Sequence, residues 1–274
     1  MASTYDPAHF SALFDIEDRH FWFIARNLAL RTVIESITPQ FPRGYHVLEV
    51  GCGTGNTLGM LQAACPDAGM IVGMDPFAEG LEFARRRSTL PLVRGSIDDP
   101  PFAAPFDLVA MFDVLEHLDD DWGVLKKARG LVTPGGRLLL TVPARKALWG
   151  RFDEESHHRR RYERAELGER IEAAGFRVDY LTYFMAALYP IARVMRYASD
   201  LVNSIRRRMQ IQQRSAVLDD IRVRPFVNGA LKLALRQELP LLRNRRQIVI
   251  GTSLLAMARP LIGGADCEPE RHTA

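Results

Sequence analysis

The feature that most constrains the fold of this 274-residue chain is a glycine-rich turn directly after an apolar segment. The segment HVLEV at 46–50 is followed by GCGTGN, which places glycine at 51, 53 and 55. Glycines at such a turn let the backbone bend sharply and let a ligand approach without a Cβ in the way. The helix expected after the turn offers unpaired N–H groups. The unit predicts an α/β fold with a ligand at this loop.

The same alternation of apolar strands and helical segments continues along the chain. Strands that alternate with helices indicate a parallel sheet, and nearly continuous apolar strands indicate a sheet covered by helices on both faces. We therefore predict seven strands, at 46–50, 69–75, 90–96, 106–113, 137–144, 176–184 and 247–259, with helices at 114–131 and 165–174 among the connections.

The chain divides by pattern into four parts. Residues 1–43 have helical spacing and are expected to form an N-terminal helical segment, and residues 44–184 with 247–262 form the α/β core. Residues 185–246 are rich in arginine and helical in pattern, which predicts an insertion lying against the sheet. The tail at 263–274 is expected to be disordered.

Two further positions restrict which class of ligand can bind at the glycine loop. A dinucleotide site requires a third glycine where this chain has Asn56, and no GK[ST] follows as a Walker loop requires. Asp75 ends the second strand twenty residues after Gly55, where a carboxylate can accept both hydroxyls of a ribose. Asn56 in place of the third glycine disfavours an NAD-dependent oxidoreductase.

Successive motifs between 47 and 143 resemble those of class I S-adenosylmethionine-dependent methyltransferases. They are E-V-G-C-G-T-G, M-D-P, G-S-I-D-D-P-P-F, F-D-L-V-A-M-F-D-V-L-E-H-L and L-V-T-P-G-G-R-L-L-L-T-V-P. The resemblance implies a Rossmann-like seven-stranded sheet whose last strand is antiparallel, and S-adenosylmethionine as the cofactor.

The resemblance also implies a role for individual residues. Many relatives carry an acidic residue where this chain has Ser96, so the adenine amino group is left to Asp98 or to the backbone. The implied contacts are Glu49 to the methionine amino group, directly or through water, Gly51, Gly53 and Gly55 beside the methionine portion, Asp75 with Pro76 at the ribose, Ser96 and Ile97 at the adenine, and Asp113 closing the site.

Methyl transfer from a sulfonium needs an aligned acceptor and, for a hydroxyl, removal of a proton. His117, in E-H-L after the fourth strand, is one candidate base, and the alternative is a structural role at the helix start. In relatives resembling the ubiquinone-pathway O-methyltransferases, the Glu and His of this segment are associated with a divalent metal. The three cysteines form no metal-binding spacing, and we assign no metal ligands from the sequence.

A second candidate lies after the fifth strand, in R-F-D-E-E-S-H-H-R-R-R-Y at 151–162. It resembles a D-E-x-x-x-H-x-R-R-Y segment of a methyltransferase subfamily that also begins with F-W-F-x-A-R-N, as at 21–27 here. By this resemblance the N-terminal helical segment at 1–43 is a lid over the cofactor, and the alternative is a helix packed in the core. Asp153 could orient His158 as the base, and the alternative is a solvated charged turn. Tyr162 joins the catalytic candidates, and the candidates for acceptor contact are Trp22, Trp149, Arg161, Phe184 and Tyr189.

The insertion combines an apolar wall with a basic rim, with eight arginines against three aspartates between 193 and 224. It could accept a hydrophobic molecule with an acidic head, lie on an anionic membrane, form a homodimer contact, or be a solvated helix with an ordinary buried face.

Together these features predict an S-adenosylmethionine-dependent methyltransferase acting on a small or lipid-like, partly hydrophobic acceptor, at oxygen before carbon or nitrogen. The alternative is a non-catalytic cofactor-binding or scaffold protein on the same fold. A net charge of +3 and the absence of an N/D-P-P-Y motif make nucleic acid an unexpected partner. The N-terminus has no basic region followed by an apolar stretch, so we expect a cytoplasmic location, with peripheral membrane contact left open.

Overall fold

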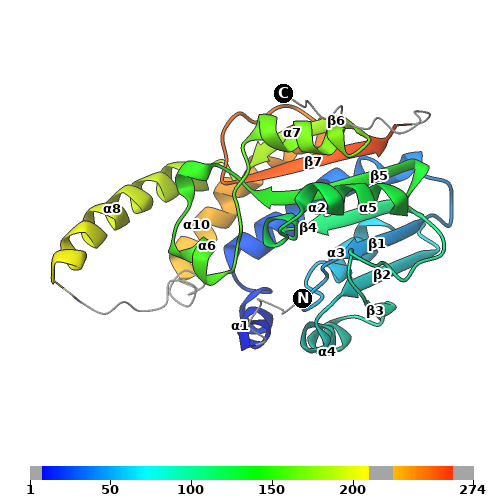
Figure 1. Ribbon diagram of the computed structural model, residues 1–274, viewed down its shortest axis with the longest axis horizontal. Helices are drawn as coiled ribbons and strands as arrows, with labels where there is room; N and C mark the ends of the chain where they lie inside the picture. Colours follow the sequence, from blue (N-terminus) through cyan, green and yellow to red (C-terminus); the bar gives the residue numbers. More distant parts are fainter. Residues whose placement is uncertain (1–7, 210–224, 262–274) are drawn as a thin grey trace, which may run out of the picture.

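Seven strands form one sheet in the order β3-β2-β1-β4-β5-β7-β6 (Figure 1). The computed structural model describes residues 8–209 and 225–261. The first five strands run parallel, and β7 pairs antiparallel with both β5 and β6. The strands are β1 (His46–Val50), β2 (Met70–Asp75), β3 (Leu92–Arg94), β4 (Phe106–Phe112), β5 (Val132–Pro143), β6 (Phe176–Phe184) and β7 (Ser253–Pro260). The predicted α/β sheet with an antiparallel last strand is confirmed.

Helices occupy most connections between the strands. Three short 3-10 helices, η1 to η3, supplement them. The helical elements are α1 (Ala8–Ile16), α2 (Phe21–Glu35), η1 (Thr38–Gln40), α3 (Leu58–Ala64), α4 (Ala78–Arg87), η2 (Leu115–His117), α5 (Asp121–Leu131), η3 (Lys146–Leu148), α6 (Arg151–Glu155), α7 (Arg164–Ala173), α8 (Leu188–Met209), α10 (Pro225–Arg236) and α11 (Leu239–Arg243).

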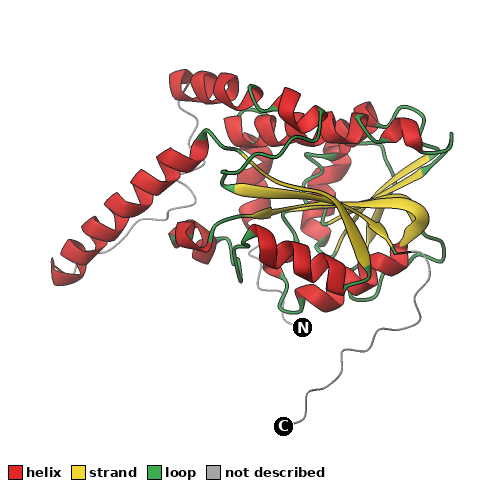
Figure 2. Ribbon diagram, turned by 90° about the horizontal axis from the view of Figure 1, so that it is seen from above, coloured by secondary structure: helices red, strands yellow, loops and turns green. Residues whose placement is uncertain are grey.

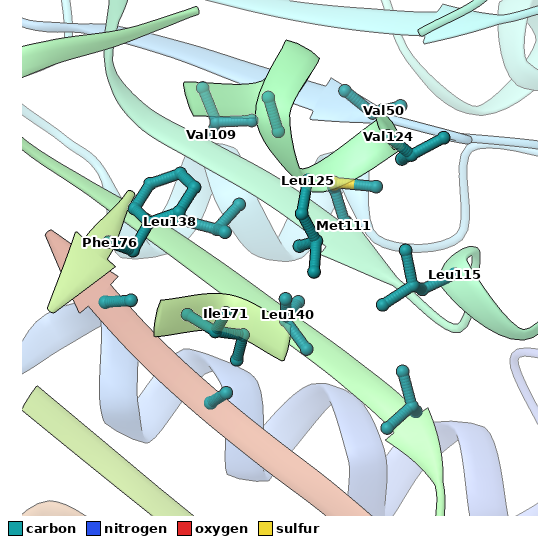
Figure 3. Close-up of a cluster of buried hydrophobic side chains, with 14 of the residues drawn as sticks. Val50, Val109, Met111, Leu115, Val124, Leu125, Leu138, Leu140, Ile171 and Phe176 are labelled. Carbon is teal, nitrogen blue, oxygen red and sulfur yellow. The ribbon is translucent and has the colours of Figure 1, made fainter. Parts of the chain in front are cut away.

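One face of the sheet packs against α5 and α7. Val124 and Leu125 of α5 and Ile171 of α7 meet alternate side chains of the central strands, such as Met111 and Leu140, in one buried cluster (Figure 3). The residues between them in β4 and β5 point to the opposite face, because successive side chains of a strand alternate.

The opposite face is covered by α2, α3, α10 and α11. Leu30 and Ile34 of α2 pack with Leu61 of α3 and with Leu235 of α10 in a second buried cluster that includes Leu139 of β5. Both faces are therefore buried, which is why the strands are apolar almost without interruption.

Two predicted elements differ from the structure. The helix predicted at 114–131 is divided into η2 and α5, because the Asp120 carboxylate accepts the Gly123 N–H at 2.8 Å and starts a new helix there. The last strand begins at 253 and not at 247, since the preceding residues leave the ladder: Ile248 donates to the Thr182 hydroxyl at 2.8 Å.

The predicted insertion separates into parts with different surroundings. The helices α10 and α11 pack on α2, whereas α8 extends away from the body of the molecule (Figure 2). Part of the insertion, 210–224, and the predicted tail at 263–274 lie outside the described residues. Within the described ranges, no helix combines the length and the apolar character needed to span a bilayer.

Candidate functional site

The glycine loop connects β1 to α3 in a backbone conformation that side chains disfavour. Gly51, Gly53 and Gly55 have φ of +75°, +49° and +77°. A Cβ at Gly51 would lie 2.4 Å from Cγ2 of Val114, and one at Gly55 would lie 3.0 Å from the backbone of Ala84. The loop is thus a tight turn that only glycine fits, and it leaves the backbone accessible beside Gly53.

Glu49 is a buried carboxylate with an unused oxygen. Its Oε1 accepts the Thr57 hydroxyl, while Oε2 is buried and has no hydrogen-bond partner among the described residues. Burial raises the pKa of Glu49 to about 7, which the Thr57 hydroxyl and the nearby Arg26 charge oppose. A buried acceptor such as Oε2 is costly to leave without a hydrogen-bond donor, and the ammonium group of a bound methionine moiety is a suitable donor.

Asp75 ends β2 with its carboxylate facing the glycine loop. Its two oxygens accept the N–H groups of Gly53 at 2.8 Å and of Phe77 at 2.9 Å. Burial raises the pKa of Asp75 to about 6. Each carboxylate oxygen has further acceptor capacity, so the pair can also receive the two hydroxyls of a ribose.

The predicted adenine side follows β3. Ile97 is buried, and the Ser96 hydroxyl accepts the Asp98 N–H at 3.1 Å, which makes a short turn. The Asp98 carboxylate pairs with Lys127 Nζ at 2.7 Å on the protein surface. Of the two alternatives for the adenine amino group, this pairing favours the backbone.

An ion pair that the sequence reasoning missed closes the carboxyl end of β4. Arg26 of α2 donates from Nη1 to the Asp113 carboxylate at 2.7 Å, and the Thr141 hydroxyl donates to its other oxygen at 3.2 Å. The Arg26 guanidinium lies 5.2 Å from the Trp22 ring centroid. The signal was the spacing of Trp22 and Arg26, because residues four apart share one helix face.

The N-terminal helices lie directly over the glycine loop. Glu17, at the end of α1, accepts the Thr54 hydroxyl at 2.5 Å and is also ion-paired with Arg87 of α4. From α2, Asn27 donates to the side-chain oxygen of Asn56 at 2.9 Å. This arrangement is the one that a lid over the cofactor requires.

A second group of polar side chains surrounds the loop after β5. Asp153 is fully buried, and its Oδ1 contacts Nδ1 of His158 at 2.9 Å and Nε of Arg161 at 2.7 Å. Burial alone would raise the pKa of Asp153, but the hydrogen bond from His158 and the Arg161 charge hold it below its usual range. The sequence-predicted pair of Asp153 and His158 is therefore in contact.

His117 and Glu116 meet this pair from the end of β4. The rings of His117 and His158 have centroids 4.9 Å apart, and one potential ligand atom from each of Glu116, His117 and His158 lies within 4.8 Å of the others. Burial lowers the pKa of His117 to about 3, and the neighbouring His158 contributes, so His117 is neutral at pH 7. The arrangement could hold a cation or pass a proton.

Glu116, the glutamate of the E-H-L segment, links the two groups, and the sequence alone assigned it no role in the site. It is buried, which raises its pKa, and the Asp113 charge adds to this, whereas Arg26 and Arg161 oppose it. Its carbonyl accepts the Arg159 N–H at 2.7 Å and holds the two loops together. Glu116 is thus influenced by charges on both the cofactor side and the His158 side.

Two predicted site residues lie in the core. Tyr162 is fully buried and donates its hydroxyl to the Asp121 carboxylate at 2.9 Å, which with burial raises its pKa. Phe184 is buried in the cluster beneath α10. These positions argue against direct contact with an acceptor, because neither side chain is open to solvent.

The other candidates for acceptor contact stay partly accessible or have a different partner. Trp22, Trp149 and Tyr189 are half-buried. Arg161 spans from Asp153 to the carbonyl of Ala144, at 3.1 Å, so its observed contacts hold the Asp153–His158 pair in place.

Comparisons with known proteins agree with this geometry. A family model described as a methyltransferase domain matches residues 22–181, more than half of the chain. The chain is 30% identical to a ubiquinone biosynthesis O-methyltransferase of Vibrio parahaemolyticus, over 42% of this chain and 50% of that protein. It is 36% identical to a trans-aconitate 2-methyltransferase of Methylobacterium radiotolerans, over 35% of this chain and 37% of that protein. The chain thus spans half or less of these two curated relatives.

Solved structures support the fold. The plantazolicin methyltransferase BpumL in complex with SAH superposes with a TM-score of 0.56 at 13% identity, covering 95% of this chain and 92% of that one. The family match over 22–181 includes the glycine loop, Asp75 and the Asp153–His158 pair. The chain belongs to the S-adenosylmethionine-dependent methyltransferase family.

Proposed function

We propose that this protein transfers the methyl group of S-adenosylmethionine to an oxygen atom of a small or lipid-like, partly hydrophobic acceptor. The observation that carries the proposal is the Asp153–His158 hydrogen bond of 2.9 Å, located after β5 and beside the end of β4. Ligands of open α/β sheets bind beyond the carboxyl ends of the strands. A base at this edge suits an acceptor that loses a proton, as a hydroxyl does.

The cofactor supplies an activated methyl group when bound, and the residues of this chain hold and orient it. Glu49 would bind its amino group and Asp75 its ribose hydroxyls, for the reasons of burial and unused acceptor capacity given above. Gly53 would let the backbone approach closely, and Arg26 with the lid would exclude water from the reacting groups.

His158 is the proposed base. Its Nδ1 faces the Asp153 carboxylate, so the ring donates its proton there and Nε2 remains the basic nitrogen. A pKa of about 3 makes His117 a weaker base at neutral pH, since proton transfer is most efficient when the pKa lies near the working pH. We assign His117 and Glu116 to shaping the pocket beside His158.

The proposed acceptor is partly hydrophobic because Trp22, Trp149 and Tyr189 are half-buried aromatic groups near the two loops. The name of the Vibrio relative, a ubiquinone biosynthesis O-methyltransferase, supports oxygen and a lipid-like molecule. The aconitate relative's name points to a small acceptor. We place the reaction in the cytoplasm or at its membrane boundary.

The proposal is tested with methyl-labelled S-adenosylmethionine and two acceptor pools, a total lipid extract and a panel of phenols and carboxylic acids. We expect label in an organic-soluble product whose methyl group mass spectrometry locates on oxygen. Label on nitrogen or carbon would contradict O-methylation alone. Binding of S-adenosylhomocysteine by calorimetry, with no labelled product from either pool, would favour the non-catalytic alternative.

A further inference from the structure

Charge is strongly segregated between the insertion and the rest of the chain. Residues 185–246 contain thirteen Lys and Arg against four Asp and Glu, a formal charge of +9. The remaining residues contain 23 basic and 29 acidic groups, a formal charge of −6, and the two values give the net charge of +3. A protein of nearly balanced charge thus carries one strongly cationic segment.

Within that segment, α8 presents an apolar face to solvent. Ile191, Val194, Met195 and Ala198 recur at the spacing of one helix face, and Val194 is 70% exposed. Arg193 and Arg196 fall on the opposite side of the helix, because successive residues are rotated by 100°. The helix is 22 residues long, which corresponds to about 33 Å.

The helix α10 also exposes apolar side chains. Phe226 is 94% exposed, Leu233 63% and Val227 51%, whereas Leu235 on the other side is buried against the core. Such groups are ordinarily hidden from water, and a cluster of them on the surface marks an interaction site.

Both helices lie at the same end of the molecule. They lie on the side of the molecule away from the edge strand β3, and α8 extends away from the body (Figures 1 and 2). Their exposed apolar groups therefore belong to one end of the protein, and both helices belong to the segment whose sequence is cationic.

We propose that α8 and α10 form a docking surface for an anionic lipid bilayer. A helix with one apolar and one basic face lies in the plane of the interface, with its apolar groups among the acyl chains and its cationic groups at the head groups. Each Lys or Arg near an anionic surface adds to the attraction. A second copy of this chain is a poorer occupant, because a symmetric contact would bring two segments of charge +9 together.

The docking surface adjoins the loop that carries the candidate base. The helix α8 contacts η3, and η3 leads to Trp149 and Gly150 just before α6. A Cβ at Gly150 would lie 2.6 Å from Nη1 of Arg196. If the proposed function is correct, docking would bring the acceptor side of the site to the membrane, where a lipid-like acceptor resides.

The test is sedimentation of the full chain with vesicles of phosphatidylcholine alone or of phosphatidylcholine with phosphatidylglycerol. We expect binding to the anionic vesicles that weakens as salt is added, because salt screens the charges. The variant Val194→Glu with Phe226→Glu should bind at least about tenfold more weakly, since burying either side chain contributes a factor of that order.

The matched control is Gln62→Glu with Ala63→Glu, which adds the same two charges on exposed positions of α3, in the body of the molecule and away from α8. It should bind vesicles as the parent does. Melting temperatures and calorimetric binding of S-adenosylhomocysteine equal to those of the parent establish that both variants are folded. If the Val194→Glu and Phe226→Glu variant does not fold, Val194→Ser with Phe226→Ser replaces it.

Three outcomes would overturn the proposal. The first is no binding to either kind of vesicle, and the second is equal binding by the parent and both variants. The third is a parent that does not bind vesicles but forms a dimer in sedimentation velocity, which only the Val194 and Phe226 variant lacks. The last outcome would assign the surface to a second copy. Vesicle binding requires neither cofactor nor acceptor, so its failure would leave the proposed methyl transfer standing.

Discussion

The guanidinium of Arg26 donates a hydrogen bond of 2.7 Å to the carboxylate of Asp113. This contact joins the N-terminal helix α2 to the end of the central strand β4, and both side chains are largely buried. Arg26 also acts electrostatically on Glu49 and Glu116. One arginine of α2 thus balances three carboxylates at the carboxyl edge of the sheet.

Replacement of Arg26 by Ala should therefore weaken cofactor binding and lower stability together. Loss of one partner of a buried ion pair leaves an uncompensated charge, which costs about 3–5 kcal/mol. We expect a lower melting temperature and at least tenfold weaker binding of S-adenosylhomocysteine, a loss of about 1.4 kcal/mol, by calorimetry. Arg31→Ala, which removes an exposed pair with Glu35 on the same helix, is the control and should change neither value. Unaltered affinity in the Arg26 variant would show that the lid does not need this contact.

Asp75→Asn tests the ribose contact while keeping the shape of the side chain. An amide offers one acceptor oxygen where the carboxylate offers two, so one backbone donor or one ribose hydroxyl loses its partner. We expect S-adenosylhomocysteine to bind at least about tenfold more weakly, and the exposed Glu79→Gln on the following helix should bind normally. A variant that binds as tightly as the parent would place the ribose elsewhere.

Cofactor affinity should fall as the pH is lowered from 8 to 5. Burial raises the pKa of Glu49 to about 7 and that of Asp75 to about 6. The bound ligand requires both as carboxylates, so protonation competes with binding below each pKa, and the loss approaches tenfold per pH unit per group. Calorimetry with S-adenosylhomocysteine across this range should show the decline, and Glu49→Gln should remove the component near pH 7. A flat profile would contradict the assignment of both carboxylates.

His158→Asn separates proton removal from structure. The Asn amide can still donate to Asp153, but it cannot accept a proton at neutral pH. Binding of S-adenosylhomocysteine should be unchanged, and turnover with the acceptor found by methyl labelling should fall about 10²-fold to 10⁴-fold, the usual contribution of a general base. His157→Asn is the control, because His157 is the exposed neighbour and asparagine tolerates its φ of +56°. Full activity of the His158 variant would rule out His158 as the base.

Tyr162→Phe should lower stability and leave the chemistry intact. The buried hydroxyl donates to Asp121, which Arg160 and Arg170 also contact at 2.9 and 2.7 Å. Removing one hydrogen bond costs about 1–3 kcal/mol when the partner stays buried, and urea unfolding would measure it. Turnover per folded molecule should equal that of the parent. Loss of turnover without loss of stability would restore Tyr162 to the catalytic residues.

The sequence by itself determined the class of fold and the cofactor loop. A glycine-rich turn after an apolar strand, and Asp75 at the end of the next strand, are signals between neighbours in the chain. The two covered faces of the sheet followed from the same local patterns, because a period of two or of 3.6 residues is set by backbone geometry. The fold class is confirmed by the seven-stranded sheet and its two buried faces, and the cofactor by the family match, while the roles of the glycine loop and Asp75 stay predictions.

Local patterns could not place long-range partners. The contact of Arg26 with Asp113 joins residues 87 apart, and that of Tyr162 with Asp121 joins residues 41 apart. Whether a polar side chain meets an ion, a substrate or the core depends on packing between elements, which the sequence does not display. Tyr162 therefore looked like a site residue, and Arg26 did not.

The same reason explains the helices before β7. The arginines and the apolar period of these helices are visible in the sequence. Only the tertiary structure decided which apolar groups are covered: Leu235 of α10 packs on the core, whereas Phe226 and Val194 face solvent. Burial is a property of the folded surface, since it depends on which other element arrives to cover a given helix face. Fold class and cofactor thus follow from local sequence, whereas the contacts of Arg26, the surroundings of His158 and the exposure of the apolar side chains of α8 depend on tertiary packing.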